Sequence, residues 1–133
     1  MTKASIFYII DDDRDDQDYL IAALKEIDPN TECFTAFNGQ QGLKNLEMHL
    51  IPIPSIIFLD MNMPRVNGRQ FLMAMKKNPQ FQDILTVVYS TSATQKDIAE
   101  TKQLGASFYL EKQPDYSILK EELQKILLLI PEV

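Results

Sequence analysis

The chain has 133 residues and a formal net charge of -6. This length suits a single domain, and the acidic balance argues against direct binding to DNA or to an anionic membrane, because such binding depends on Lys and Arg. The single cysteine, Cys33, excludes an intramolecular disulfide and a thiolate metal cluster. No run of ~18 apolar residues that could span a membrane occurs, so we expect a soluble, cytoplasmic protein.

The chain begins with an apolar run followed by carboxylates. Residues 5–10 (SIFYII) predict a strand that ends in Asp11, Asp12 and Asp13. Residues 13–27 place apolar side chains at helical spacing, which predicts a helix. We expect the acidic residues of its first turns to form a solvated face favoured by the helix dipole. These residues are Asp13, Asp15, Asp16 and Asp18.

A second strand and helix follow. Residues 31–37 (TECFTAF) predict a strand, and Asn38-Gly39 offers a cap for the next helix. The apolar stripe of this helix consists of Leu43, Leu46 and Leu50. Two prolines in residues 51–54 then predict a connection.

The central apolar run, residues 56–60 (IIFLD), predicts a strand buried on both faces that ends at a carboxylate. Asp60 is therefore either a site residue or a cap for the next turn. Residues 61–68 (MNMPRVNG) predict a loop, because Pro64 and Asn67-Gly68 are turn formers. A helix follows over residues 69–77.

The last part of the chain repeats the alternation. Residues 84–90 (ILTVVYS) predict a buried strand that ends in hydroxyls, and residues 94–104 predict a polar helix that packs only lightly. Residues 107–110 predict a short strand that leads to Lys112. Residues 116–130 predict an amphipathic helix.

Five strands alternating with five helices predict an α/β fold with a parallel sheet, because each crossover helix must pack back on the sheet. Ligands of such sheets bind at the carboxyl ends of the strands. The polar residues at these ends are Asp11, Asp12, Asp13, Asp60, Ser90, Thr91 and Lys112.

Carboxylates at close range repel one another unless a cation neutralises them. An all-oxygen set favours Mg²⁺ over zinc or copper. Beside such an ion a carboxylate can attack phosphorus, and Lys112 and Ser90 would each contact an oxygen of the phosphoryl group.

These residues, taken in order, resemble the receiver domain of bacterial two-component response regulators, of the single-domain, chemotaxis-regulator-like type. The match covers nearly the whole chain and implies a flavodoxin-like fold with strand order 2-1-3-4-5. The motifs that carry it are Asp11-Asp12, Asp60-Met61-Asn62-Met63-Pro64 with Gly68, Ser90-Thr91, Gly105-Ala106, Tyr109 and Lys112.

The resemblance implies a role for each site residue. Asp60 would accept a phosphoryl group from a histidine kinase or a histidine phosphotransfer protein. Mg²⁺ would be bound directly by Asp12, through water by Asp11, by the backbone carbonyl of Asn62, and by Asp60 itself. The residues that would stabilise the phosphoryl group or respond to it are Ser90, Thr91, Tyr109 and Lys112.

The resemblance also implies a signalling protein rather than an enzyme. With residues 1–133 as one receiver and no output domain, another protein would read the phosphorylated state, and the fourth helix and fifth strand would bind that protein or a second copy. In the family a proline usually follows the lysine, commonly after a cis bond, whereas here Gln113 intervenes. Such a bond before a non-proline residue costs about 2.5–4 kcal/mol.

Two alternatives remain open. One is a receiver-like binding module that is not phosphorylated, an alternative that the Gln113 anomaly keeps open. The other is a small phosphatase of the haloacid dehalogenase type with an aspartate nucleophile. That type requires a second Asp at position 62 as acid and base, and Asn62 cannot serve.

Overall fold

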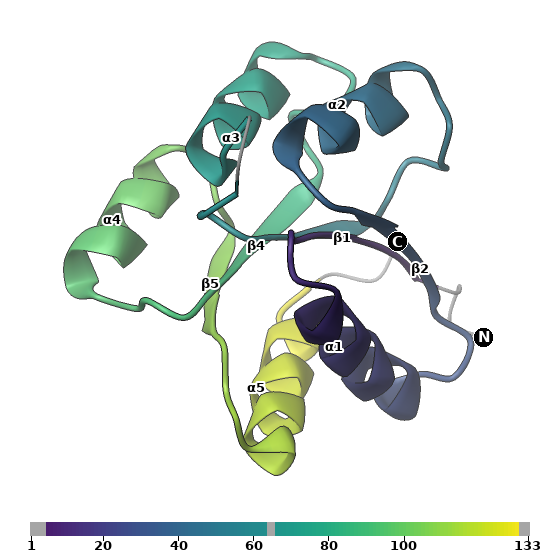
Figure 1. Cartoon of the computed structure of the whole chain (residues 1–133), viewed down its shortest axis with the longest axis vertical. Helices are drawn as coiled ribbons and strands as arrows, with labels where there is room; N and C mark the ends of the chain where they lie inside the picture. Colours follow the sequence, from purple (N-terminus) through teal and green to yellow (C-terminus); the bar gives the residue numbers. More distant parts are fainter. Residues whose placement is uncertain (1–4, 64–65, 131–133) are drawn as a thin grey trace.

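The structure is a computed structural model that describes residues 5–63 and 66–130. Strands and helices alternate along it (Figure 1). The strands are β1 (Ile6–Ile10), β2 (Glu32–Ala36), β3 (Ile56–Leu59), β4 (Leu85–Ser90) and β5 (Phe108–Glu111). The helices are α1 (Arg14–Ile27), α2 (Gly39–Glu47), α3 (Gly68–Lys77), α4 (Gln95–Gln103) and α5 (Tyr116–Leu128).

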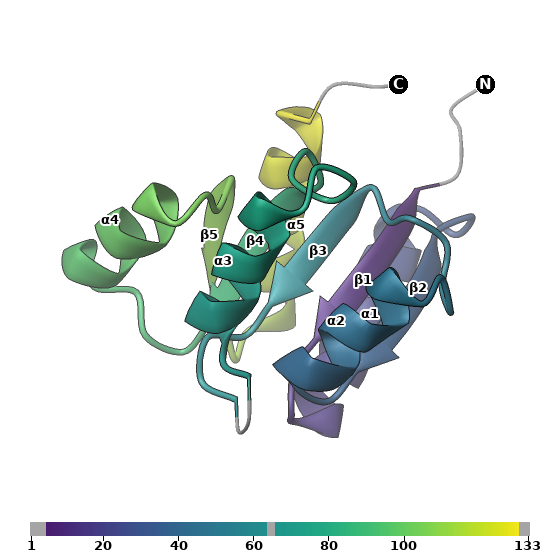
Figure 2. The ribbon, with the colours of Figure 1, turned by 90° about the horizontal axis from the view of Figure 1, so that it is seen from above.

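The strands form one parallel sheet in the order β2-β1-β3-β4-β5, which confirms the predicted flavodoxin-like fold. The sheet is viewed from above in Figure 2. The strand order reverses direction between β1 and β3, and this switch point is where α/β sheets bind ligands. In the register, Ile10 of β1 pairs with Leu59 of β3. Asp11 and Asp60, which follow directly, are thereby brought to the same edge of the sheet.

Helices cover both faces of the sheet, with α1 and α5 on one side and α2, α3 and α4 on the other (Figure 1). Successive side chains of β1 alternate between the two cores: Phe7 and Ile9 pack with α1 and α5, and Tyr8 and Ile10 with α2 and α3. Each fully buried side chain of this size contributes about 1.5–3 kcal/mol to folding. The two cores therefore fix the strands, and with them the polar residues at the strand ends.

The start of α3 is held by a capping box. Asn67 Oδ1 accepts a hydrogen bond from Gln70 N at 2.9 Å, and Gln70 Oε1 accepts one from Asn67 N at 3.0 Å. Gly68 follows directly, and a Cβ at this position would lie 2.7 Å from the backbone oxygen of Asp60. Only glycine allows α3 to begin this close to the end of β3.

As predicted, α4 packs lightly. Thr101 is its only buried residue, while Ile98 and Ala99 are exposed. Thr94 caps the helix, since its side chain accepts a hydrogen bond from Asp97 N at 3.1 Å. A helix with so little buried surface can move at a small cost in packing energy.

Two helix ends differ from the prediction. The second helix ends at Glu47, so Leu50 is not part of its apolar stripe but is 60% exposed. The chain turns there because His49 has a φ of 55°. The last helix ends at Leu128 rather than at residue 130. Pro64, in the predicted loop, lies outside the described residues.

No helix in the described parts of the chain is both long enough and apolar enough to cross a membrane.

Candidate phosphoacceptor and metal site

Asp60 lies directly after β3 and is only 6% exposed. Its backbone N–H donates to Ile10 O at 2.9 Å, which extends the pairing of β3 with β1 by one residue. Its Oδ1 accepts a hydrogen bond from Asn62 N at 3.2 Å. Asp60 therefore forms the turn contact that a capping residue makes. Its second oxygen, Oδ2, instead lies 3.9 Å from the ammonium of Lys112.

Two further carboxylates come from the end of β1. Asp11 is buried at 1% exposure, and Asp12 is exposed. One oxygen from each of Asp11, Asp12 and Asp60 lies within 4.8 Å of the others. Asp11 Oδ1 accepts a hydrogen bond from Asp13 N at 2.9 Å, and its buried Oδ2 is paired with the Lys112 ammonium at 2.9 Å. An all-oxygen cluster of three carboxylates fits a divalent cation.

Lys112 comes from the loop after β5, where its backbone N–H donates to Ser90 O at 2.8 Å. Its Nζ lies 2.9 Å from Asp11 Oδ2 and 3.9 Å from Asp60 Oδ2. The predicted ammonium is thus brought to the predicted carboxylates. The bond to Gln113 is trans, because no peptide bond within residues 5–63 and 66–130 is cis. The loop therefore holds Gln113 between Lys112 and Pro114 without a cis peptide bond.

Asp16 also reaches this cluster, contrary to the prediction that it belongs to a solvated face. Its Oδ2 accepts a hydrogen bond from Lys112 Nζ at 2.8 Å, and its side chain is 37% exposed. Helical spacing contained a signal for this position, because Asp16 lies one turn before Leu20, which is buried. Asp13, Asp15 and Asp18 are exposed as predicted.

The burial of these groups shifts their pKa values. Burial raises the pKa of Asp60 to about 7, against the opposing effect of Lys112. Burial likewise raises the pKa of Asp11. Burial alone would lower the pKa of Lys112, but its contacts with Asp11 and Asp16 outweigh this and raise it. Lys112 is therefore charged at neutral pH, and a cation at the site would favour the ionised form of Asp60.

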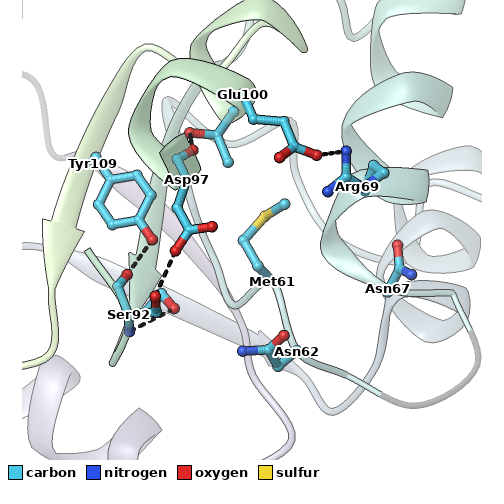
Figure 3. A pocket seen from close by; sticks show the side chains of 10 residues that line it. Met61, Asn62, Asn67, Arg69, Ser92, Asp97, Glu100 and Tyr109 are labelled. Carbon is cyan, nitrogen blue, oxygen red and sulfur yellow. Dashed lines mark hydrogen bonds and ion pairs between the residues drawn. The ribbon is translucent and has the colours of Figure 1, made fainter. Parts of the chain in front are cut away.

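A polar cavity of about 290 Å³ lies beside the site, between the loop after β3 and α4 (Figure 3). Ser90, which is buried, and Tyr109 both line it. The Tyr109 hydroxyl donates a hydrogen bond to Ser92 O, and Ser90 Oγ accepts one from Ser92 N at 3.3 Å. Thr91 is exposed and is not a lining residue.

An ion pair between Arg69 and Glu100 joins α3 to α4 on the far side of this cavity (Figure 3). Both side chains are substantially exposed, so the pair adds little to the free energy of unfolding. Sequence reasoning had not identified this contact, because neither residue lies at a strand end. Asn62 lines the cavity and is exposed.

Comparisons with known proteins agree with this geometry. The family model of the response regulator receiver domain matches residues 7–124. The response regulator Rcp1 of Synechocystis is 35% identical over 68% of this chain, and the sporulation initiation phosphotransferase F of Bacillus subtilis is 29% identical over 85%. The chain spans 59% of that Rcp1 sequence, 89% of the phosphotransferase and 32% of the chemotaxis protein CheV3 of Helicobacter pylori, another relative.

Solved structures show the same fold. The Mn²⁺-bound form of Rcp1 superposes with a TM-score of 0.85 at 23% identity, covering 97% of this chain and 99% of that one. The phosphorylated cyanobacterial phytochrome response regulator RcpA superposes with a TM-score of 0.84 at 26% identity, covering 93% of this chain and 91% of that one. The family match begins within β1, extends past Lys112 and includes every carboxylate of the cluster. The chain belongs to the response regulator receiver domain family.

Proposed function

We propose that this chain is a response regulator that accepts a phosphoryl group on Asp60 in a Mg²⁺-dependent His-to-Asp relay. The observation that carries the proposal is the cluster itself: three carboxylates share one edge of the sheet with oxygens within 4.8 Å of one another, and a lysine ammonium lies 3.9 Å from the proposed acceptor. Receiver domains typically take their phosphoryl group from a histidine kinase or a phosphotransferase.

In the proposed reaction, an Asp60 oxygen attacks the phosphorus of a phosphohistidine. A P–O bond forms to Asp60 as the P–N bond breaks, and the imidazole leaves with the electron pair of that bond. A divalent cation supplies charge neutralisation for the transferred oxygens. Asp12 and Asp60 would hold this cation directly, Asp11 through water, and Asn62 through its backbone carbonyl.

All the donors are oxygens, which favours a hard divalent cation such as Mg²⁺ over zinc or copper. The Mn²⁺ in the Rcp1 structure supports this assignment, since Mn²⁺ and Mg²⁺ share a preference for oxygen ligands. Burial raises the pKa of Asp60 to about 7, so the cation would also keep the nucleophile ionised at neutral pH.

The remaining site residues would respond to the new group. Lys112 would contact one phosphoryl oxygen, and the buried Ser90 hydroxyl would contact another. Tyr109 shares a cavity with Ser90 and is bonded to the backbone of Ser92, so a movement of this loop would reach it directly. The exposed position of Thr91 supports at most a contact through its backbone.

Another protein would bind the phosphorylated form and respond to it. The single-domain organisation of the chain stays a prediction, as does the use of α4 and β5 to bind a partner or a second copy. The light packing of α4 supports this choice of surface, because a helix with one buried residue can shift without disturbing a core.

The phosphatase alternative lacks support in the site, because Asn62 occupies the position where an acid and base is needed. The trans bond after Lys112 weakens the reason for the unphosphorylated alternative. The Gln113 insertion leaves the ammonium within 3.9 Å of Asp60.

The test is to incubate the protein with Mg²⁺ and acetyl phosphate and to measure its intact mass. We expect one phosphoryl adduct that is labile to base, absent without Mg²⁺ and absent in Asp60→Ala. Asp15→Ala removes an exposed carboxylate and should leave the adduct unchanged. No adduct under any condition would favour the binding module, and rapid turnover of phosphomonoesters would favour the phosphatase.

A further inference from the structure

The ammonium of Lys112 is closer to two other carboxylates than to the proposed acceptor. Its Nζ lies 2.8 Å from Asp16 Oδ2, 2.9 Å from Asp11 Oδ2 and 3.9 Å from Asp60 Oδ2. The last distance is too long for a hydrogen bond. Asp11 belongs to the carboxylate cluster, whereas Asp16 comes from helix α1 and has no role in the reaction described so far.

The position of Asp16 is fixed by its neighbour on α1. Gln17 is buried, and its Nε2 donates to Asp11 O at 2.8 Å and to Ala36 O at 2.9 Å. These bonds tie the start of α1 to the ends of β1 and β2. The Asp16 N–H also donates to Asp13 Oδ1 at 3.1 Å, so the helix begins in a defined place.

The ring of Tyr89 lies beside the Lys112 ammonium and restricts its movement on that side. The Lys112 Nζ lies 5.3 Å from the centre of the Tyr89 ring, which is within the range of a cation–π contact. Tyr89 is buried in the core that faces α1 and α5. The charged end of Lys112 is therefore held among Asp11, Asp16 and an aromatic face, and its side chain is only 12% exposed.

We propose that Asp16 is a positioning residue that holds the Lys112 ammonium beside Asp60 but out of direct contact with it. The Asp60 oxygen then stays free for the metal and for phosphorus, while the ammonium is already in place for the transferred group. The inference rests on the proposed function of Asp60 as a phosphoacceptor.

Removing Asp16 would change the balance of attractions on Lys112. The side chain has four rotatable methylene groups, and Asp60 is the nearest remaining carboxylate after Asp11. Attraction between opposite charges grows as the distance falls, so the ammonium would close the gap to Asp60. A direct ion pair there would tie up the nucleophilic oxygen and slow phosphoryl transfer.

One test observes the ammonium without any reaction. In metal-free protein labelled with ¹⁵N-lysine, the Lys112 NH₃⁺ group should give an NMR signal protected from rapid hydrogen exchange, assigned by its loss in Lys112→Arg. We expect Asp16→Ala to shift the position of this signal, because the ammonium turns from Asp16 to Asp60, and Asp18→Ala to leave it unchanged. Asp18 is an exposed carboxylate on the same helix, so its removal makes the same change in net charge. A signal at the wild-type position in Asp16→Ala would overturn the proposal.

The second test measures phosphorylation by acetyl phosphate at saturating Mg²⁺, followed by intact mass. We expect Asp16→Ala to slow the reaction about tenfold and Asp18→Ala to stay within about twofold of wild type. Saturating Mg²⁺ separates a slower reaction from weaker metal binding. Thermal unfolding of each variant confirms that the fold is kept.

A double-mutant cycle decides whether Asp16 acts through Lys112. If it does, Asp16→Ala has no further effect in a Lys112→Ala background. An equal slowing in both backgrounds, or a wild-type rate in Asp16→Ala, contradicts the proposal. If wild type forms no adduct at all, the proposed function fails instead, and the NMR measurement still decides whether Asp16 positions Lys112.

Discussion

The ammonium of Lys112 lies beside Asp60 at the end of the sheet, with Nζ 3.9 Å from Oδ2 of Asp60. One positive charge thus lies among three carboxylates, because the ammonium also contacts Asp11 and Asp16. The site carries an excess of negative charge in a largely buried place. This excess of negative charge makes the stability of the metal-free protein depend on pH.

Asp60→Asn should stabilise the metal-free protein at alkaline pH. The folded pKa of Asp60, about 7, lies above the unfolded value of 3.8, so folding favours the protonated form. Wild type is therefore about as stable as the variant below about pH 4, and it loses stability relative to the variant as the pH rises to about 7. We expect a gain of at least about 1 kcal/mol at pH 8, and none at pH 4, by urea unfolding in EDTA. An equal gain at both pH values would contradict this assignment.

Mg²⁺ binding should release protons near neutral pH. The cation competes with the proton on Asp60, whose pKa is raised to about 7, so affinity should fall as pH drops from 8 to 6. Calorimetry in two buffers of different ionisation enthalpy measures the number of protons released. Asp12→Ala should weaken binding at every pH, whereas Asp18→Ala, which removes an exposed carboxylate, should change it little. Affinity independent of pH would show that Asp60 is not a ligand.

Lys112→Met should destabilise the metal-free protein most at high pH. The substitution leaves Asp11 buried at 1% exposure with no cation beside it. Breaking a buried ion pair on one side costs about 3–5 kcal/mol. The loss should shrink at low pH, where the carboxylates are protonated, and should be partly recovered by added Mg²⁺. Urea unfolding with and without Mg²⁺ measures this; a loss that is the same at pH 4 and pH 8 would point to packing instead.

Gly68→Ala should destabilise the protein and disturb the site. An added Cβ would lie 2.7 Å from both the Asp60 oxygen and the Met61 Cα, and backbone atoms cannot yield as a flexible side chain does. Overpacking of this kind costs about 1–3 kcal/mol. Met73→Ala, at an exposed position of the same helix, is the matched control. If Gly68→Ala is as stable as the control in urea unfolding, α3 does not begin as close to Asp60 as described.

The sequence predicted which residues cluster because most of them lie at strand ends. An apolar run that stops at Asp11, at Asp60 or at Ser90 identifies both a buried strand and the polar residue that follows it. Parallel pairing then brings these residues to one edge, as the pairing of Ile10 with Leu59 does. The strand order came from the resemblance, since alternation alone does not determine it.

Asp16 and the end of α2 were missed for physical reasons. Acidic residues in a first helical turn are stabilised by the helix dipole, so Asp16 looked like its exposed neighbours until Lys112 was placed beside it. Leu50 continued an apolar stripe by spacing, but the left-handed backbone of His49 ends the helical path before it. The contact of Asp16 depends on a tertiary neighbour, and the end of α2 depends on a backbone angle; the periodicity of apolar residues encodes neither.

The most direct test of the account is to identify the residue that carries the phosphoryl group. Protein phosphorylated in the presence of Mg²⁺ is treated with borohydride, which reduces an aspartyl phosphate to homoserine, and is then analysed by peptide sequencing in a mass spectrometer. The account predicts homoserine at position 60 and unmodified Asp11, Asp12 and Asp16. Homoserine at any of these three positions, or at none, would contradict it.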